Sequence, residues 1–173
     1  GIVYTDDAGI PLIATRGSFT SGQARHANHV LRTKYPEWRP PKGKTVLVEI
    51  IYPENRIVVD YGDTDDLVLL GMVDIETGIS YGPRALLEWP GPRAETFPYL
   101  SLREALSAPP RPGKEGLVVH FVDSDDRVKI KQNDYVALHR IVTGLNEQVV
   151  WEHLKYHDDV SELIEGLPDE FYD

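Results

Sequence analysis

The feature that most constrains the fold is a succession of short strand-like runs separated by turn clusters. Residues 45–51, 56–61 and 67–74 are rich in aliphatic and β-branched residues, and clusters of Gly, Pro, Asn and Asp divide them. Runs of this length with turn chemistry between them predict β-strands joined by short connections. A chain built in this way forms antiparallel sheets more readily than a helical bundle.

Two hairpins and several helices complete the predicted elements. Residues 1–4 with 10–16, and residues 116–122 with 127–131, flank Asp-rich turns and predict two β-hairpins. A helix is predicted from a cap at Thr20 or Ser21 to about Tyr35, because Pro36 cannot continue it. Two short helices are predicted at 83–89 and 102–107, and the hydrophobic period becomes helical from Asn133 onward.

The order of these elements indicates the fold class. Strands with hairpin connections come first and helices come last, which is an α+β pattern rather than an alternating βαβ pattern. We therefore expect antiparallel β-sheets flanked by helices. The predicted division is a core over residues 1–132 and the start of a helical region over residues 133–173.

Composition excludes several classes of protein. The 173 residues contain no cysteine, which excludes a disulfide framework, cysteine-ligated zinc and a thiol nucleophile. No apolar run approaches the roughly 18 residues of a membrane span, and no signal peptide is visible. We therefore expect a cytoplasmic protein without a membrane partner.

The charge is distributed unevenly along the chain. The formal net charge is −10, yet residues 16–44 contain seven basic residues and one acid. Residues 145–173 contain nine acids and one base. Such asymmetry is typical of a polyanion-facing half with a solvating tail, although two ordinary solvated faces would look the same. The net charge thus excludes a protein whose whole surface is basic and binds nucleic acid. It does not exclude a local anion-binding site.

Three short motifs do not support a function. Gly43-Lys44-Thr45 ends like a phosphate-binding P-loop, but Trp38 stands where that motif needs its first glycine. Ser80 lies in a G-x-S-x-G run, but the residues before it predict a hairpin turn rather than a buried strand, so a serine hydrolase is a remote alternative. His26 and His29 share a helix face without a third metal ligand.

A carboxylate interrupts the apolar run 46–51. Strand alternation places Glu49 on the same face as Leu47 and Ile51. A charged group among apolar neighbours is costly unless something binds it. An edge strand with Glu49 in water is one interpretation, and a functional carboxylate held in a cleft is the one we favour.

The last predicted hairpin gathers charged residues. Lys129 and Lys131 are two apart on a strand, so their ammonium groups project from one face while Val128 and Ile130 cover the core. Two close cations repel each other unless solvent or an anion such as a triphosphate lies between them. Glu115 opens the partner strand and would place a ligand for Mg²⁺ beside them.

The chain resembles a known family in five segments. VEIIYPENRIVVDYG (48–62), EGLVVHF (115–121) and VKIKQNDYVALHRI (128–141) are similar to motifs III, IV and V of the covalent nucleotidyltransferases. Within that superfamily they resemble the ATP-dependent RNA ligases of the phage end-sealing type. ATRGSF (14–19) resembles motif Ia, and LLGMVD (69–74) occupies the place of motif IIIa. LPDEFYD (167–173) is similar to the helical region after motif V.

The resemblance implies a nucleotidyltransferase (ATP-grasp-like) fold and a three-step reaction. In that reaction a motif I lysine attacks the α-phosphate of ATP to give lysyl–AMP and pyrophosphate. AMP then passes to an RNA 5′-phosphate, and a 3′-hydroxyl displaces it to seal the strand. ATP, Mg²⁺ and RNA ends are the implied cofactors and partners.

The resemblance also implies roles for individual residues. Glu49 would bind the ribose and Glu115 would bind the divalent metal, while Arg16 would contact the adenylate. Lys129 and Lys131 would neutralise the α-phosphate as charge develops there. Adenine would pack on aliphatic carbon, at Leu69 or Leu70, where some relatives have an aromatic ring.

One motif of the family is missing from this sequence. The K-x-D-G run of motif I is expected just before the first strand, but the sequence starts at Gly1 without it. We therefore expect that this chain is the core of a longer ligase and that it does not adenylylate itself. The alternatives are a non-catalytic nucleotide- or RNA-binding module and another nucleotidyltransferase of the capping or DNA-joining type. The RNA substrate and the oligomeric state are not predicted.

Overall fold

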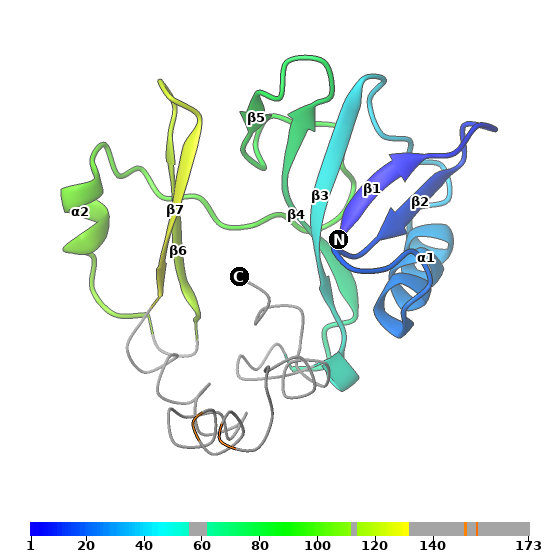
Figure 1. The fold of residues 1–173 in the computed structure, drawn as a ribbon, viewed down its shortest axis with the longest axis horizontal. Helices are drawn as coiled ribbons and strands as arrows, with labels where there is room; N and C mark the ends of the chain where they lie inside the picture. The colour runs from blue at the N-terminus through cyan, green and yellow to red at the C-terminus, as the bar shows by residue number, and fades with distance from the viewer. Residues whose placement is uncertain (56–61, 112–113, 132–150, 152–154, 156–173) are drawn as a thin grey trace. The chain divides into compact units, whose positions relative to one another are not determined.

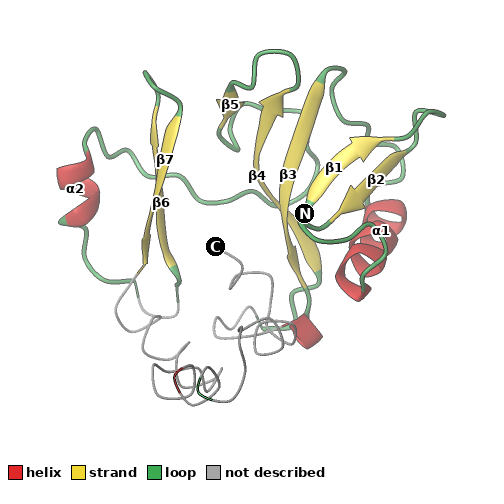
Figure 2. Ribbon diagram, viewed as in Figure 1, coloured by secondary structure: helices red, strands yellow, loops and turns green. Residues whose placement is uncertain are grey.

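The computed structural model describes residues 1–55, 62–111, 114–131, 151 and 155. These residues form an α+β structure with antiparallel sheets, which confirms the predicted fold class (Figures 1 and 2). The chain divides into two compact units. The first contains Gly1–Arg56, Tyr61–Ser101 and His120–Arg127, and the second contains Ile57–Asp60, Leu102–Val119 and Val128–Asp173.

The first unit is built on a five-stranded antiparallel sheet. Its strands are β1 (Ile2–Thr5), β2 (Pro11–Ala14), β3 (Lys44–Ile51), β4 (Asp66–Asp74) and β5 (Ser80–Tyr81). Their order across the sheet is β2-β1-β3-β4-β5, so β3 is central. The predicted first hairpin and the predicted strands at 45–51 and 67–74 are confirmed. The predicted strand at 56–61 lies outside the described residues.

Helix α1 (Gly22–Lys34) packs against the sheet. The Ser21 hydroxyl accepts a hydrogen bond of 3.1 Å from the Ala24 amide, so Ser21 is the N-cap that the sequence predicted. The helix ends at Lys34, two residues before Pro36. One face is apolar and buried, and the opposite face is exposed.

The core lies between α1 and one face of the sheet. Aliphatic side chains of β1, β2, β3 and β4 meet the apolar face of α1. Residues from the loops that follow α1 and β5 pack at the edge of this core. Trp38 and Trp89 pack edge to face with their ring centroids 4.8 Å apart. Among the described residues, the largest fully buried side chains are those of Val3, Ile13, Val30, Leu31, Val46, Val48, Leu67, Leu69 and Leu86.

A buried amide ties α1 to the edge strand β2. The Asn28 side chain accepts from the Ile13 amide at 2.9 Å and donates to the Ile13 carbonyl at 2.7 Å. It also donates to the Ala24 carbonyl at 2.7 Å. The side chain therefore takes the place of a neighbouring strand, because it satisfies both backbone groups of a residue that has no further strand beside it.

A bulge in β4 separates two neighbouring leucines. The pairing of β3 with β4 shifts between Leu47 and Val48, so Leu47 pairs with Gly71 and Val48 pairs with Leu69. Leu70 is the extra residue in β4. Leu69 is fully buried in the core, whereas Leu70 is 42% exposed.

The helix predicted at 83–89 is wrong. The segment forms turns instead, and the guanidinium of Arg93 donates to its carbonyl groups. Nη1 donates to Pro83 O and Leu86 O, and Nη2 donates to Leu87 O and Trp89 O at 2.9 and 2.8 Å. One arginine thus satisfies carbonyls that a helix would pair with its own amides.

The described part of the second unit contains a short helix and the base of a hairpin whose tip, His120–Arg127, belongs to the first unit. Helix α2 (Leu102–Leu106) confirms the helix predicted at 102–107. Strands β6 (Gly116–Phe121) and β7 (Asp126–Lys131) form a two-stranded sheet and confirm the second predicted hairpin. A Cβ at Gly116 would lie 1.9 Å from the Ile130 carbonyl oxygen, so only glycine fits where β7 passes.

The helical segments predicted from Asn133 onward, and the division at residues 132 and 133, lie outside the described residues. Within the part of the chain that the structure describes, no helix is long and apolar enough to cross a membrane.

Candidate nucleotide site

The face of the sheet opposite α1 is the first candidate site. We call it the open sheet face and define it by Ile2, Leu47, Glu49, Val68 and Leu70. Cross-strand pairing places Ile2 beside Leu47 and Glu49 beside Val68. These side chains are exposed or half-buried, whereas their neighbours along each strand are in the core. The face is therefore apolar with one carboxylate.

Glu49 is exposed on the central strand β3. The strand β3 is therefore not an edge strand, and a functional carboxylate held in a cleft stays a prediction. Glu49 follows the part of β3 that contacts the start of the chain, where the Val48 amide donates to the Gly1 carbonyl at 2.9 Å. A carboxylate at this position accepts hydrogen bonds from hydroxyl groups of a ligand that lies on the open sheet face.

A loop carries Arg16 beside the same face. Buried Thr15 folds this loop, since its amide and its hydroxyl both donate to the Ser18 carbonyl, at 2.9 and 3.1 Å. Phe19 then packs edge to face on Tyr4, with a centroid distance of 5.8 Å. Alternation in β1 puts Tyr4 on the open sheet face. Arg16 is exposed in this loop.

The bulge in β4 distinguishes the two leucines that the sequence left as alternatives. Leu69 is fully buried beneath the sheet, so it presents no surface to a ligand. Leu70 is exposed on the same sheet face as Glu49. Of the two predicted adenine contacts, Leu70 is the one in a position to make that contact.

The β6–β7 hairpin carries the second candidate group. Glu115 precedes β6, and its Oε1 forms an ion pair with Lys129 Nζ without ordinary hydrogen-bond geometry. The Glu115 and Lys129 side chains are 29% and 47% exposed, and Lys131 is exposed on the same strand. Sequence reasoning thus placed these three residues on one hairpin correctly. Val128 was predicted to cover a core, but it is 45% exposed.

The donor set of the hairpin fits Mg²⁺ to a limited extent. Glu115 supplies one half-buried carboxylate, and Mg²⁺ commonly takes one or two protein carboxylates and completes its octahedron with water and substrate phosphates. In the described ranges, no group of three His, Asp or Glu residues is arranged to hold a metal. The residues therefore fit an ion held jointly with a phosphate ligand rather than a protein cage.

A charged cluster that the sequence did not predict lies at the tip of this hairpin, in the first unit. Asp125 accepts from the Ser80 amide at 2.8 Å and from the Ser80 hydroxyl at 2.5 Å. His120 Nε2 lies 2.6 Å from Asp125 Oδ1. Arg127 Nη1 donates to Ser80 Oγ and lies 3.4 Å from Asp125 Oδ1. No local pattern joins residues 45 positions apart, so this cluster required the tertiary structure.

The cluster lacks the order of a catalytic triad. In a triad the imidazole lies between the hydroxyl and the carboxylate. Here the hydroxyl of Ser80 and the imidazole of His120 contact the same oxygen of Asp125. Ser80 is in strand β5 and not at a strand-to-helix elbow. The geometry does not support the serine hydrolase alternative.

The hydrogen bonds at Asp125 favour its ionised form. The Ser80 hydroxyl is the largest cause, and the Ser80 amide, His120 and Arg127 add to it, so the pKa of the Asp125 carboxyl falls to about 2. Burial opposes this change. Asp125 therefore acts as a charged anchor between β5 and the hairpin tip.

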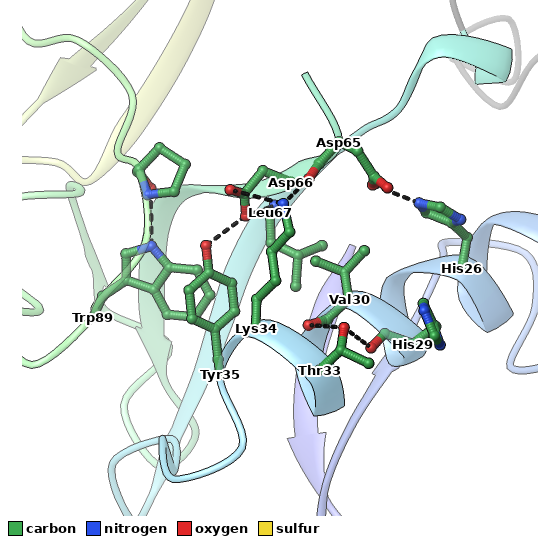
Figure 3. Close-up of polar contacts among 11 residues, drawn as sticks. His26, His29, Val30, Thr33, Lys34, Tyr35, Asp65, Asp66, Leu67 and Trp89 are labelled. Carbon is green, nitrogen blue, oxygen red and sulfur yellow. Dashed lines mark hydrogen bonds and ion pairs between the residues drawn. The ribbon is translucent and has the colours of Figure 1, made fainter. Parts of the chain in front are cut away.

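His26 and Lys44, which belong to the other two short motifs, each contact an aspartate of the same chain. Figure 3 shows His26 against Asp65, with His26 Nε2 2.7 Å from Asp65 Oδ1. Lys44 is in β3, and its Nζ lies 2.5 Å from Asp74 Oδ2. A lysine within a strand differs from the loop-to-helix position that a P-loop lysine takes.

Comparison with known proteins supplies no family for this chain. No protein-family model matches it, and no curated protein matches it. Function must therefore be argued from its own residues.

Proposed function

We propose that this chain is the nucleotidyltransferase core of an ATP-dependent RNA ligase. The observation that carries this proposal is the open sheet face, on which Glu49 and Leu70 lie together on the side of the sheet that α1 does not cover. The sequence resemblance implies a ribose contact at Glu49 and an adenine contact at Leu69 or Leu70. The resemblance supplies the reaction, and the sheet supplies a surface with matching chemistry.

The chemistry of each group supports this proposal. An aliphatic side chain such as Leu70 contacts the flat face of a base, and the carboxylate of Glu49 accepts hydrogen bonds from ribose hydroxyls. Arg16 adds a guanidinium, which binds phosphate oxygens through paired donors. The ligand is therefore proposed to lie on the open sheet face with its phosphates toward Arg16.

The hairpin residues supply the charge that phosphoryl transfer needs. Lys129 and Lys131 balance negative charge on the α-phosphate while a lysine nitrogen bonds to phosphorus and pyrophosphate leaves. Mg²⁺ bound at Glu115 supplies further positive charge for the phosphates. Glu115 also keeps the Lys129 ammonium from repelling Lys131 in the absence of ligand.

Nucleotide binding by the 173-residue chain is the first test. We expect ATP with Mg²⁺ to bind in isothermal titration calorimetry, and Glu49→Gln and Leu70→Ala each to weaken binding roughly tenfold, about 1.4 kcal/mol. Glu88→Gln is the matched control, because Glu88 is exposed in a loop away from the strands. Equal affinity in all four proteins would contradict the site.

Covalent adduct formation tests the reaction itself. A chain extended upstream to include a K-x-D-G run is expected to form an acid-stable protein–AMP adduct with labelled ATP and Mg²⁺. Lys129→Ala or Lys131→Ala should abolish the adduct, because alanine supplies no counter-charge, whereas Ser80→Ala should retain it. Undiminished labelling of both lysine variants would show that the hairpin is not part of the site. An extended gene without such a run would favour a non-catalytic binding module.

A further inference from the structure

The exposed face of α1 carries cations and no acid. Arg25, His29 and Arg32 follow one another at spacings of four and three residues, which places them on one side of a helix. All three are exposed, and the opposite side of the helix is in the core. The helix sequence from 22 to 34 contains no Asp or Glu. We call Arg25, His29 and Arg32 the basic helix face.

Neighbouring acids contact other basic residues of the helix but not this face. Asp65 engages His26, and Asp66 engages Lys34 at 3.4 Å, along the flank where α1 meets the start of β4. Figure 3 shows these contacts, and it draws no side-chain contact at His29. Among the described residues, the basic helix face has no ion pair with a carboxylate, and the Arg25 guanidinium donates to the Thr20 carbonyl at 2.6 Å.

The spacing of the two arginines suits an extended polyanion. Seven residues of helix separate Arg25 from Arg32, which is about 10 Å along the axis. One strand of a duplex has a phosphate about every 3.4 Å along its axis, so two guanidinium groups at this distance reach separate phosphates of one strand. The His29 imidazole lies between them and can donate to a phosphate oxygen. A single small anion would not use both arginines.

We propose that the basic helix face binds the phosphate backbone of an RNA strand. The argument for this partner is charge complementarity, since three adjacent cationic or hydrogen-bond-donating side chains face solvent while the chain as a whole has a net charge of −10. The choice of RNA as the polyanion rests on the proposed ligase function. The contact is sequence-independent, because guanidinium groups on phosphates carry no base information.

Fluorescence anisotropy with a labelled single-stranded RNA of 20 nucleotides tests the proposal in the 173-residue chain. We expect the double variant Arg25→Gln/Arg32→Gln to lower affinity roughly tenfold at low salt. The slope of log K against log salt should decrease by about 1.4, at roughly 0.7 per released phosphate contact of a single strand. The control is Arg84→Gln/Arg103→Gln, which changes the net charge equally at two exposed arginines outside α1.

Three readouts make the outcome decisive. Thermal unfolding followed by circular dichroism checks that both double variants fold, and calorimetry with ATP is expected to be unchanged by either. Loss of RNA affinity in the α1 variant alone supports the basic helix face, even if ATP does not bind and the proposed function fails. An equal loss of RNA affinity in the control variant overturns it. So does an RNA affinity of the α1 variant that equals or exceeds that of the unsubstituted chain. The latter is the result expected if the acidic segment 145–173 were the true occupant.

Discussion

The five-stranded sheet and the β6–β7 hairpin are stabilised in different ways. The sheet buries one face under α1, and whole rows of its side chains are inaccessible to solvent. In the described residues of the second unit only Ala105 is buried, and Val118 and Val128 of the hairpin are 61% and 45% exposed. The sheet therefore depends on apolar burial, whereas the described hairpin depends on strand pairing, its turn, one glycine and the hydrogen bonds of Asp125 with Ser80.

This difference has a functional consequence. Glu49 and Leu70 are fixed by a packed sheet, so a ligand on the open sheet face meets a rigid surface. Lys129, Lys131 and Glu115 stand on a hairpin whose described residues have little core of their own. The residues proposed to contact the nucleoside are thus on a packed sheet, and the residues proposed to balance phosphate charge are on an element with less packing.

The largest expected effect is on the free energy of unfolding, when a buried side chain of the sheet is shortened and compared with an exposed one of the hairpin. Leu69→Ala should lower the free energy of unfolding by about 2–5 kcal/mol, because it leaves a cavity in the core. Val128→Ala, the exposed counterpart, should cost about 0.5 kcal/mol or less. Urea unfolding followed by tryptophan fluorescence reports both values, since Trp38 and Trp89 lie in the core. Equal costs would contradict the contrast between the two regions.

A glycine substitution tests what stabilises the hairpin. Gly116→Ala should cost about 1–3 kcal/mol, because the new Cβ meets the backbone of Ile130 and not a movable side chain. Hydrogen exchange should show lost protection in β6 and β7, with the sheet amides unaffected. Gly22→Ala is the control, because nothing lies within 4 Å of its Cβ, and it should be neutral or slightly stabilising. Protection retained in the hairpin of the Gly116 variant would show that its strands pair less closely.

The smallest expected effect concerns the anchor at Asp125. Its pKa is lowered to about 2 in the folded chain, so its ionised form contributes stability above its unfolded pKa of roughly 3.9. This contribution is lost as the pH falls from about 4 toward 2. Asp125→Asn should therefore lower the thermal midpoint at pH 6 and reduce its decline between pH 4 and pH 2.

Exposed Asp123→Asn in the same turn is the control for this titration. It should leave the wild-type decline intact. A decline in the Asp125 variant as steep as that of the wild type would show that other acids dominate the acid transition.

Local patterns predicted most of the described elements for identifiable reasons. Ser21 and Pro36 bound α1, and alternating aliphatic residues mark β3 and β4, because capping and strand periodicity are short-range effects. The prediction of a helix at 83–89 is wrong. Arg93 binds the carbonyls of that segment from outside it, and no pattern within the segment carries this information.

The candidate site shows the same limit. Sequence reasoning placed Glu115, Lys129 and Lys131 on one hairpin, because pairing across a tight turn is local. It did not distinguish Leu69 from Leu70, since a bulge between two strands sets their directions. It also left an edge strand open for Glu49, whereas the structure has that side chain exposed on the central strand β3.

The sequence by itself determined the elements: the strands, the capped helix, the turn glycines and the charge asymmetry that makes α1 basic. Only the tertiary structure decided which face of the sheet α1 covers, which of two adjacent leucines is exposed, and that Ser80 and Asp125 meet across 45 residues. The physical reason is the distance along the chain over which each effect acts. Backbone conformation and charge are set by neighbours in the chain, whereas burial and long-range hydrogen bonds depend on which surfaces pack together.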